Sequence, residues 1–281
     1  MRKELKEAKR IVIKIGTTSI TYKNGNINLR KMEKLARVLT DLRNSGKEIV
    51  LVSSGAIGAG MNKLGLTKKP VELKEKQATA AVGQALLMQL YQKFFNEYNQ
   101  TIAQLLLTKD VITDDIKRKN TENTLYTLIK MGVIPIANEN DSVSTDEIKG
   151  SKIGDNDTLS AMVAILVKAD VLLMLSDIDG LYDSSPAENP NAKLISTVEI
   201  IDERIYEIAG GSNSIVGTGG MYTKIKAADN LMKEGIHTII ASGENVEVIY
   251  DILEGKMIGT FFSTKKKEKK NDWTYKKRWK M

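Results

Sequence analysis

Short runs of aliphatic and β-branched residues alternate with longer segments of helical periodicity along most of this 281-residue chain. Six such runs predict strands, over residues 10–15, 48–52, 101–107, 133–137, 171–175 and 236–241. Apolar residues that recur every three or four positions predict helices over residues 29–44, 74–96, 117–131, 158–168 and 221–234. Strands that are apolar almost throughout are typical of parallel sheets covered on both faces by helices. The chain is therefore predicted to be an α/β protein, a three-layer αβα sandwich with a mainly parallel central sheet.

The positive charge of the chain is concentrated at its C-terminal end. Lys plus Arg number 42 and Asp plus Glu number 35, which gives a formal net charge of +7. Residues 265–281 hold nine of the basic and two of the acidic residues, so residues 1–264 balance at 33 of each. We therefore expect one domain over 1–264 and a basic tail over 265–281. The tail is expected to be solvated, with contact to RNA, a membrane surface or another subunit as the alternatives.

Two absences narrow the chemistry. The chain has no cysteine, which excludes disulfides, thiol catalysis and cysteine-bound zinc. It has one histidine, His237, so a metal centre with several histidines from one chain is excluded as well. We expect His237 to be structural and any metal to be a hard cation such as Mg²⁺, with no residue assigned as its ligand. Nucleic-acid binding by the domain is not expected. No apolar run is long enough to span a bilayer and the charged start has no signal-peptide core, so we expect a cytoplasmic protein without membrane association.

Small, hydroxyl-bearing and acidic residues follow four of the predicted strands. They are GTTS at residues 16–19, SSGAIGAG at 53–60, NENDSVST at 138–145 and SDIDGLYD at 176–183. In parallel sheets of this kind, ligands bind beyond the carboxyl ends of the strands. The sequence therefore predicts one shared site at that edge.

Lys14 lies near the end of the first predicted strand, between Ile13 and Ile15. Because successive side chains of a strand point to opposite faces, Lys14 is expected to point away from these two neighbours. A lysine within a buried strand is costly unless it is paired or used. The alternative is a lysine that reaches solvent at the end of the sheet.

Two glycine-containing segments have the features of anion-binding turns. Residues 53–60 place hydroxyls and then glycines between a strand and a helix, although these glycines could equally serve close helix packing. Residues 217–224, GTGGMYTK, open a helix and offer free backbone N–H groups, the hydroxyls of Thr218 and Thr223, and the cation Lys224. This segment is not a Walker A loop, and a glycine-rich surface loop is its alternative interpretation.

Two clusters of acids and amides, NEND at 138–141 and GDND at 154–157, lie near predicted strand or helix ends. By default such residues cap helices or form turns. A cap needs only one of them, however, and the lysine-bearing segments are expected at the same edge. These clusters therefore indicate a polar binding site, whereas DIDG at 177–180 alone is consistent with a plain turn.

Taken together, six segments resemble the amino acid kinase family. In chain order they are VIKIGTTSI, VSSGAIGAG, IPIANENDSV, GDNDTLSA, LLSDIDGLYD and GTGGMYTK. Each segment alone is weak evidence, but the occurrence of all six in this order is specific. The resemblance covers about residues 10–262.

The resemblance implies a role for each matching residue. Lys14 would contact the ATP phosphates and stabilise the transferring phosphoryl group together with Lys224, and Asp157 would orient the two lysines. The acceptor would be bound by Ser54, Asp141 and Asn156. The nucleotide would be bound by Lys14, Ser176, Asp177, Thr218, Gly219, Gly220, Met221, Tyr222, Thr223 and Lys224.

Within the family, NEND, GDND and TGGMxTK are similar to the motifs of members that use ATP and Mg²⁺ to phosphorylate the γ-carboxylate of L-glutamate, the first step of proline synthesis. A carboxylate acceptor is already ionised at neutral pH, so no general base is needed, which fits a chain with one histidine. Members that act on N-acetylglutamate, aspartate, carbamate, a nucleotide or an isoprenoid phosphate remain alternatives, as does a non-catalytic sensor. The resemblance also implies a dimer or tetramer, feedback inhibition by proline, and a form without the PUA domain of many members.

Overall fold

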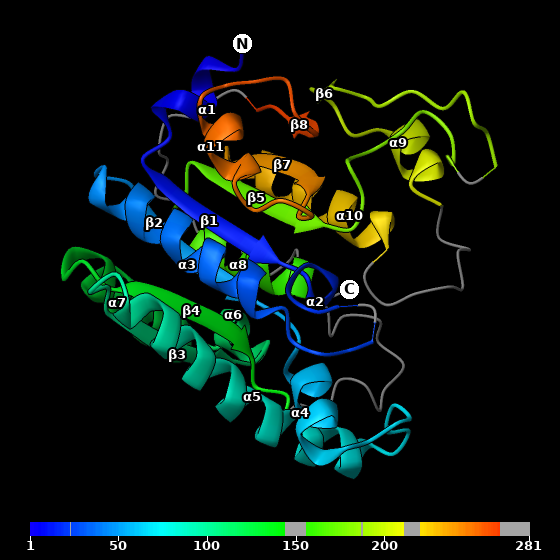
Figure 1. The fold of residues 1–281 in the computed structure, drawn as a ribbon. Coiled ribbons are helices and arrows are strands. Elements are labelled where there is room, and N and C mark those ends of the chain that lie inside the picture. Colours follow the sequence, from blue (N-terminus) through cyan, green and yellow to red (C-terminus); the bar gives the residue numbers. More distant parts are fainter. Residues whose placement is uncertain (23, 144–155, 187, 211–219, 265–281) are drawn as a thin grey trace.

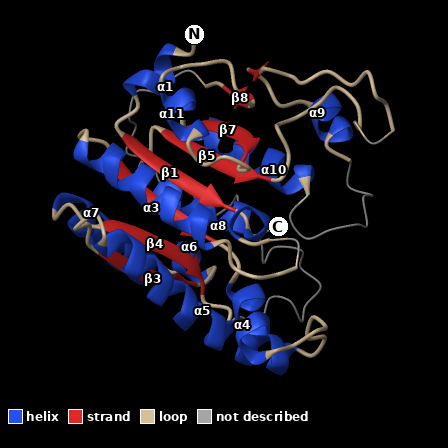
Figure 2. Ribbon diagram, viewed as in Figure 1, coloured by secondary structure: helices blue, strands red, loops and turns tan. Residues whose placement is uncertain are grey.

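The computed structural model describes residues 1–22, 24–143, 156–186, 188–210 and 220–264. Its centre is one eight-stranded sheet in the order β3-β4-β2-β1-β5-β7-β8-β6 (Figures 1 and 2). The strands are β1 (Arg10–Ile15), β2 (Glu48–Ser53), β3 (Ile102–Leu107), β4 (Ile134–Glu139), β5 (Val171–Ser176), β6 (Thr197–Val198), β7 (His237–Ser242) and β8 (Thr260–Phe262).

The six longer strands are parallel, as predicted. β1 lies between β2 and β5, with Val12 opposite Val50 on one side and Leu172 on the other. At one edge the direction reverses, because β8 pairs antiparallel with β7 and β6 runs parallel to β8. The prediction of a mainly parallel sheet is confirmed. The carboxyl ends of the six parallel strands all lie on the same side of the sheet, called its carboxyl edge below.

Helices cover both faces of the sheet and bury two separate cores. One core contains Ile11, Ile13 and Ile15 of β1, and it is covered by α3 (Leu29–Asn44), α5 (Leu73–Asn96) and α11 (Val248–Leu253). The other contains Val12 of β1, and it is covered by α7 (Asp115–Lys130), α8 (Asn156–Leu166) and α10 (Met221–Lys233). Successive side chains of β1 therefore point in turn to the two helix layers of an αβα sandwich.

Several short elements have no counterpart in the sequence prediction. They are α1 (Lys3–Glu7), α2 (Thr17–Ile20), α4 (Ala56–Leu64), α6 (Asp110–Thr113), α9 (Glu203–Ile208), α11, β6 and β8. Most span one or two turns, or two to three strand residues, which is too short for a periodic pattern to show. The longer predicted elements agree with the structure to within a few residues, and Asn28 caps α3 as expected by accepting from the Lys31 amide.

Two glycines allow α4 and α5 to pack in backbone contact. A Cβ atom on Gly60 would lie 1.9 Å from the carbonyl oxygen of Thr79, and one on Gly83 would lie 1.8 Å from that of Ala56. No other residue type fits at either position without moving a helix. Gly55 instead adopts a left-handed conformation with φ of +99°, in the turn that leads into α4.

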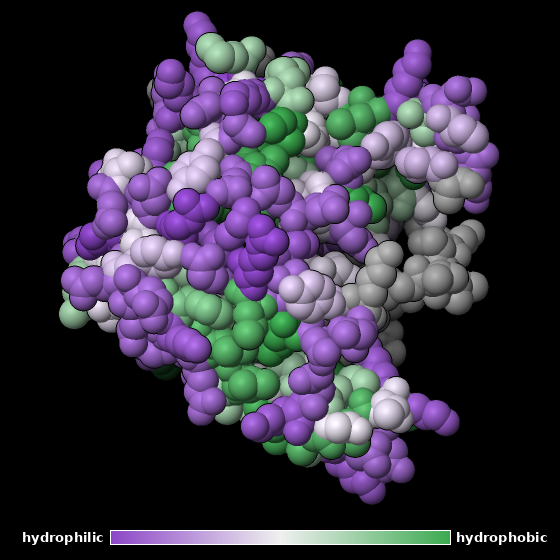
Figure 3. All heavy atoms as spheres, viewed as in Figure 1, coloured by the Kyte–Doolittle hydropathy of each residue, from purple (hydrophilic) through white to green (hydrophobic). Residues whose placement is uncertain are grey.

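The outer surface is mostly polar. Figure 3 shows polar residues over most of the face in view, with apolar residues gathered between α3 and α5. Within the described ranges, no helix is both long enough and apolar enough to cross a membrane.

Candidate active site

Three segments far apart in the sequence bring Lys14, Asp157 and Lys224 together. The Nζ atom of Lys14 lies 2.6 Å from Oδ1 of Asp157, and the Nζ atom of Lys224 lies 3.0 Å from Oδ2. Asp157 is completely buried, and only 6% of Lys14 and 3% of Lys224 is exposed. The three residues assigned catalytic roles from the sequence therefore form one buried ion-pair cluster.

The fold explains how each of these side chains reaches the cluster. Lys14 follows Val12 by two positions on β1 and so points to the same face, where α8 lies, as the alternation predicted. Asp157 is in the first turn of α8, where the helix dipole favours an anion. Lys224 is in the first turn of α10, where the same effect disfavours a cation, so its buried position depends on a nearby negative charge.

The two lysines determine the ionisation of Asp157. Burial by itself would raise the pKa of the Asp157 carboxyl, but the ammonium groups of Lys14 and Lys224 outweigh it and hold that pKa below its ordinary value of 3.8. At neutral pH the cluster is therefore two cations around one anion. These three side chains sum to one positive charge, which suits the binding of a phosphate.

Thr223, next to Lys224 in α10, also contacts the carboxylate. Its Oγ1 donates to Oδ2 of Asp157 at 2.9 Å and also lies 2.8 Å from the carbonyl oxygen of Gly220. Ser160 of α8 bonds to the backbone of Asp157 instead, with its hydroxyl donating to the carbonyl oxygen at 2.7 Å. The sequence pattern placed Thr223 in a phosphate-binding segment and gave no sign of its bond to Asp157.

The turn after β2 holds the first residue of the predicted acceptor site. Ser54 is buried and precedes Gly55, and a Cβ on Gly55 would touch Thr17 of the turn after β1 at 3.5 Å. The neighbouring Ser53 donates to the carbonyl oxygen of Ser54 at 3.3 Å and shares a 2.9 Å hydrogen bond with the hydroxyl of Tyr91 in α5. Burial raises the pKa of Tyr91 to about 12, so its hydroxyl stays protonated. The turns after β1 and β2 are thus adjacent.

Asn156 and Asp141 occupy two further segments at this edge of the sheet. Asn156 is the first residue of α8, adjacent to Asp157, and its buried Oδ1 has no hydrogen-bond partner among the residues that the structure describes. Such an atom is costly unless a ligand satisfies it. Asp141 lies in the turn after β4. The end of β4, just before that turn, is held from α5, because the side chain of Asn138 donates to Gln84 at 2.8 Å.

The predicted nucleotide residues lie after β5 and at the start of α10. Ser176 ends β5 and its hydroxyl donates to the carboxylate of Asp177 at 2.9 Å. Gly220 caps α10, followed by Met221 and by Tyr222, whose ring lies 5.6 Å from that of Tyr206 in α9. Thr218 and Gly219 lie outside the described residues, as does the tail 265–281.

The sequence prediction did not include Tyr91 and Gln84 of α5, which hydrogen-bond to Ser53 and Asn138 beside the predicted acceptor residues. Both contacts join residues about 40 to 55 positions apart. The only signal in the sequence is the presence of polar side chains on a long amphipathic helix, and that signal does not identify their partners.

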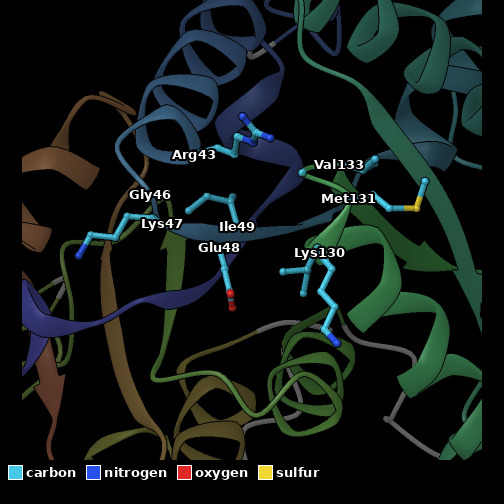
Figure 4. Close-up of a pocket in the computed structure, with 10 residues that line it drawn as sticks. Arg43, Gly46, Lys47, Glu48, Ile49, Lys130, Met131 and Val133 are labelled. Carbon is cyan, nitrogen blue, oxygen red and sulfur yellow. The ribbon is translucent and has the colours of Figure 1, made fainter.

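Other hollows lie at the opposite edge of the sheet. A pocket of about 260 Å³ lies between the end of α3, the start of β2 and the turn after α7. Figure 4 shows Arg43, Lys47 and Lys130 among the residues around it. A larger cavity of about 830 Å³ is lined by His237 and by several acidic side chains. His237 accepts a hydrogen bond from the Thr264 amide and lies 5.3 Å from the Phe261 ring, so it is held structurally and far from the cluster, as expected.

Among the residues that the structure describes, no group of three or more His, Asp or Glu side chains could hold a metal ion. Mg²⁺ is commonly bound through substrate phosphates and one or two carboxylates.

Comparison with known proteins identifies the family of this chain. The amino acid kinase family profile matches residues 9–242. Proteins named glutamate 5-kinase are similar along nearly the whole chain. The one from Clostridium perfringens (strain 13 / Type A) is 54% identical over 269 residues, 95% of this chain and 100% of that protein. The one from Listeria monocytogenes serovar 1/2a is 52% identical over 98% of this chain and 100% of its own length. The one from Enterococcus faecalis is also 52% identical, over 93% of this chain and 97% of its own length.

A solved structure shares the fold. The crystal structure of UMP kinase from Bacillus anthracis superposes with a TM-score of 0.60 at 16% identity, over 91% of this chain and 96% of that one. At this identity the likeness concerns the arrangement of the chain and not its substrate. With the family profile, the relatives and the shared fold in agreement, the chain belongs to the amino acid kinase family.

Proposed function

We propose that this protein transfers the γ-phosphoryl group of ATP to the γ-carboxylate of L-glutamate, which gives L-glutamyl 5-phosphate for proline synthesis. The observation that supports this most strongly is the buried cluster in which Asp157 holds Lys14 and Lys224 at the carboxyl edge of the sheet. The relatives that are more than half identical to this chain are named for the same activity.

The reaction brings the glutamate carboxylate close to the ATP phosphates, and the positive charge of the cluster reduces the repulsion between these two anions. A carboxylate oxygen of glutamate attacks the γ-phosphorus, a P–O bond to the acceptor forms, and the bond to the β-phosphate oxygen breaks with its electron pair left on ADP. Lys14 and Lys224 stabilise the charge on the transferring group, as buried cations do in other phosphoryl-transfer sites. Asp157 is proposed to hold these lysines in position and not to act as a base, because both of its oxygens are already paired.

The remaining predicted residues divide between the two substrates. Ser54, Asp141 and Asn156 are proposed to bind glutamate, with the carboxylate of Asp141 suited to its ammonium group. Ser176, Asp177, Gly220, Met221 and Tyr222 are proposed to contact the nucleotide, with Thr218 and Gly219 before them. When bound with ATP, Mg²⁺ would neutralise part of the phosphate charge.

Acceptor identity is tested by trapping the acyl phosphate. The purified protein is incubated with ATP, Mg²⁺ and hydroxylamine, together with glutamate, N-acetylglutamate or aspartate, and hydroxamate formation is measured. We expect product with glutamate. Product with another acceptor and none with glutamate would replace the proposed substrate, and ATP binding without any turnover would favour a sensor.

The cluster is tested by removing each cation. Lys14→Ala or Lys224→Ala should lower kcat by roughly 100-fold or more, as for other lost electrostatic stabilisers. Lys226→Ala is the matched control, because Lys226 lies two residues further along α10 with its side chain exposed. Near-normal turnover of either folded cluster variant would contradict the assigned role.

Several expectations stay predictions. They are a homo-oligomer, either a dimer or a tetramer, inhibition by proline, a cytoplasmic location, a single domain over 1–264, and no role for nucleic acid.

A further inference from the structure

Two hydrogen-bond donors from one turn of α10 converge on a single oxygen of Asp157. Oδ2 receives the hydroxyl of Thr223 at 2.9 Å and the ammonium of Lys224 at 3.0 Å, whereas Oδ1 faces Lys14 at 2.6 Å. A lysine ammonium is a compact charge on a flexible stem and constrains direction weakly. The hydroxyl of Thr223 sits on a short, β-branched side chain with few rotamers. Thr223 therefore supplies the most directional of these contacts.

The hydroxyl has one proton and two acceptors within reach. The alternative acceptor is the carbonyl oxygen of Gly220, three residues earlier, at 2.8 Å. A bond of this kind within a helix is common for threonine and contributes little. The bond to Asp157 is charge-assisted and therefore stronger, so the proton is placed on the carboxylate side for most of the time.

We propose that Thr223 is a positioning residue for phosphoryl transfer, which fixes the rotation of the Asp157 carboxylate so that Lys14 and Lys224 are both aimed at the transferring group. This inference rests on the proposed function, and it differs from the phosphate-binding role that the sequence motif implies for Thr223. A phosphate contact would act on ATP affinity, whereas a positioning residue acts on the chemical step through Asp157.

The two roles separate in steady-state and binding measurements on the full chain. Thr223→Val removes the hydroxyl but keeps the branched shape, and it should lower kcat by about 10-fold to 100-fold, the range for a lost charge-assisted hydrogen bond. The dissociation constant for ATP should stay within about 3-fold. Thr223→Ser restores the donor and should recover kcat to within about 3-fold of the original protein. Thr124→Val is the control, because the hydroxyl of Thr124 bonds to the helix backbone of α7 at 2.9 Å, away from the cluster.

A double-mutant cycle tests whether the effect passes through Asp157. If Thr223 acts by positioning that carboxylate, Thr223→Val should change kcat by less than about 3-fold when added to Asp157→Asn. An equal effect in both backgrounds would overturn the inference. It would also be overturned by a kcat within 3-fold of the original in Thr223→Val, by a main effect on ATP binding, or by a Thr223→Ser variant as slow as the valine variant.

Failure of the proposed function would be visible separately. If the unmodified protein forms no glutamyl hydroxamate, the acceptor assignment fails, and the same variants are compared with whichever acceptor reacts. The inference on Thr223 concerns the lysine–aspartate cluster and is tested equally well with that acceptor. Melting curves of each variant, recorded first, show that the folded proteins are compared.

Discussion

Replacing Gly60 with alanine should push α4 and α5 apart, whereas the same replacement at Gly58 of the same helix should not. A Cβ on Gly60 would lie 1.9 Å from the Thr79 carbonyl oxygen, so reaching an ordinary contact requires a separation of about 1.5 Å. A Cβ on Gly58 would meet only the Thr17 methyl group at 3.6 Å, which is an ordinary contact already. The two variants therefore differ in available space and in little else.

The stability cost follows from this geometry. Overpacking of this kind costs about 1–3 kcal/mol. At about 2–4 °C for each kcal/mol in a chain of this size, Gly60→Ala should melt roughly 2–12 °C lower than the original protein. Gly58→Ala should melt at the same temperature or slightly higher, because alanine is favoured over glycine in a helix by up to about 1 kcal/mol.

Gly60→Ala should impair the use of glutamate more than the binding of ATP. α4 begins at Ala56, directly after Ser54 and Gly55, so a displaced α4 moves the turn proposed to bind glutamate. The cluster around Asp157 is built from β1, α8 and α10 and should be disturbed less. Since a misplacement of about 1 Å can cost up to about 100-fold, we expect kcat/KM for glutamate to fall by roughly 10-fold to 100-fold and ATP binding to change by less than about 3-fold.

Two measurements check this prediction: a thermal melt, and the hydroxamate assay with glutamate varied at saturating ATP. The reasoning is refuted if Gly60→Ala and Gly58→Ala melt together and have equal kcat/KM for glutamate. It is also refuted if Gly60→Ala weakens ATP binding as much as it weakens glutamate use.

Three further predictions concern charge. Asp157→Asn leaves two buried lysines without their shared carboxylate and should cost about 3–5 kcal/mol, with ATP raising its melting temperature more than that of the original protein. The folded-state pKa of Asp157 is lowered, so the stabilisation from its ionised carboxylate is fully present above the unfolded pKa of about 3.9 and is lost as pH falls through the folded pKa. The urea midpoints of the original protein and of Asp157→Asn should therefore converge below about pH 4. Arg2→Ala should lower the urea midpoint, because the buried guanidinium donates to the carbonyl oxygens of Ser196, Ile258 and Gly259. Deleting residues 265–281 should leave hydroxamate formation within about 2-fold, because every assigned site residue precedes the tail; a loss of activity would contradict this.

The long elements were predictable because burial leaves a pattern in the sequence. β5 is apolar at five consecutive positions and is buried throughout, so its run of residues predicts it directly. β6 has two residues and β8 has three, and no alternation can appear over such lengths. These two strands exist because β7 offers a free edge, where Ile239 lies opposite Phe261, and that edge is a property of the assembled sheet.

The chemical groups of the site were predictable from residue types, whereas their pairing was predicted only through the family resemblance. The sequence indicates Lys14 as a lysine in a buried strand and Lys224 as a cation after a glycine-rich segment. Residue types and spacing alone do not indicate that one aspartate contacts both lysines, because that contact requires α8 and α10 to pack side by side, and only the family resemblance implied that Asp157 orients them. Of the two interpretations that the sequence left open for the glycines of residues 53–60, the structure bears out close helix packing, and anion binding stays a prediction. Gly60 serves close helix packing, and Gly55 provides the left-handed turn beside Ser54.

The ratio of two lysines to one aspartate explains how the cluster can be stable without a ligand and still attract one. Two buried ammonium groups alone would repel each other, and Lys224 is also disfavoured by its place in the first turn of α10. A single carboxylate in the first turn of α8 compensates for both and is itself held ionised by them. A second carboxylate would cancel the remaining positive charge and weaken the binding of a phosphoryl group, whereas none would destabilise the fold. The net charge that matters for this chemistry is therefore the one positive charge of three side chains, and not the +7 of the whole chain, which arises from residues 265–281.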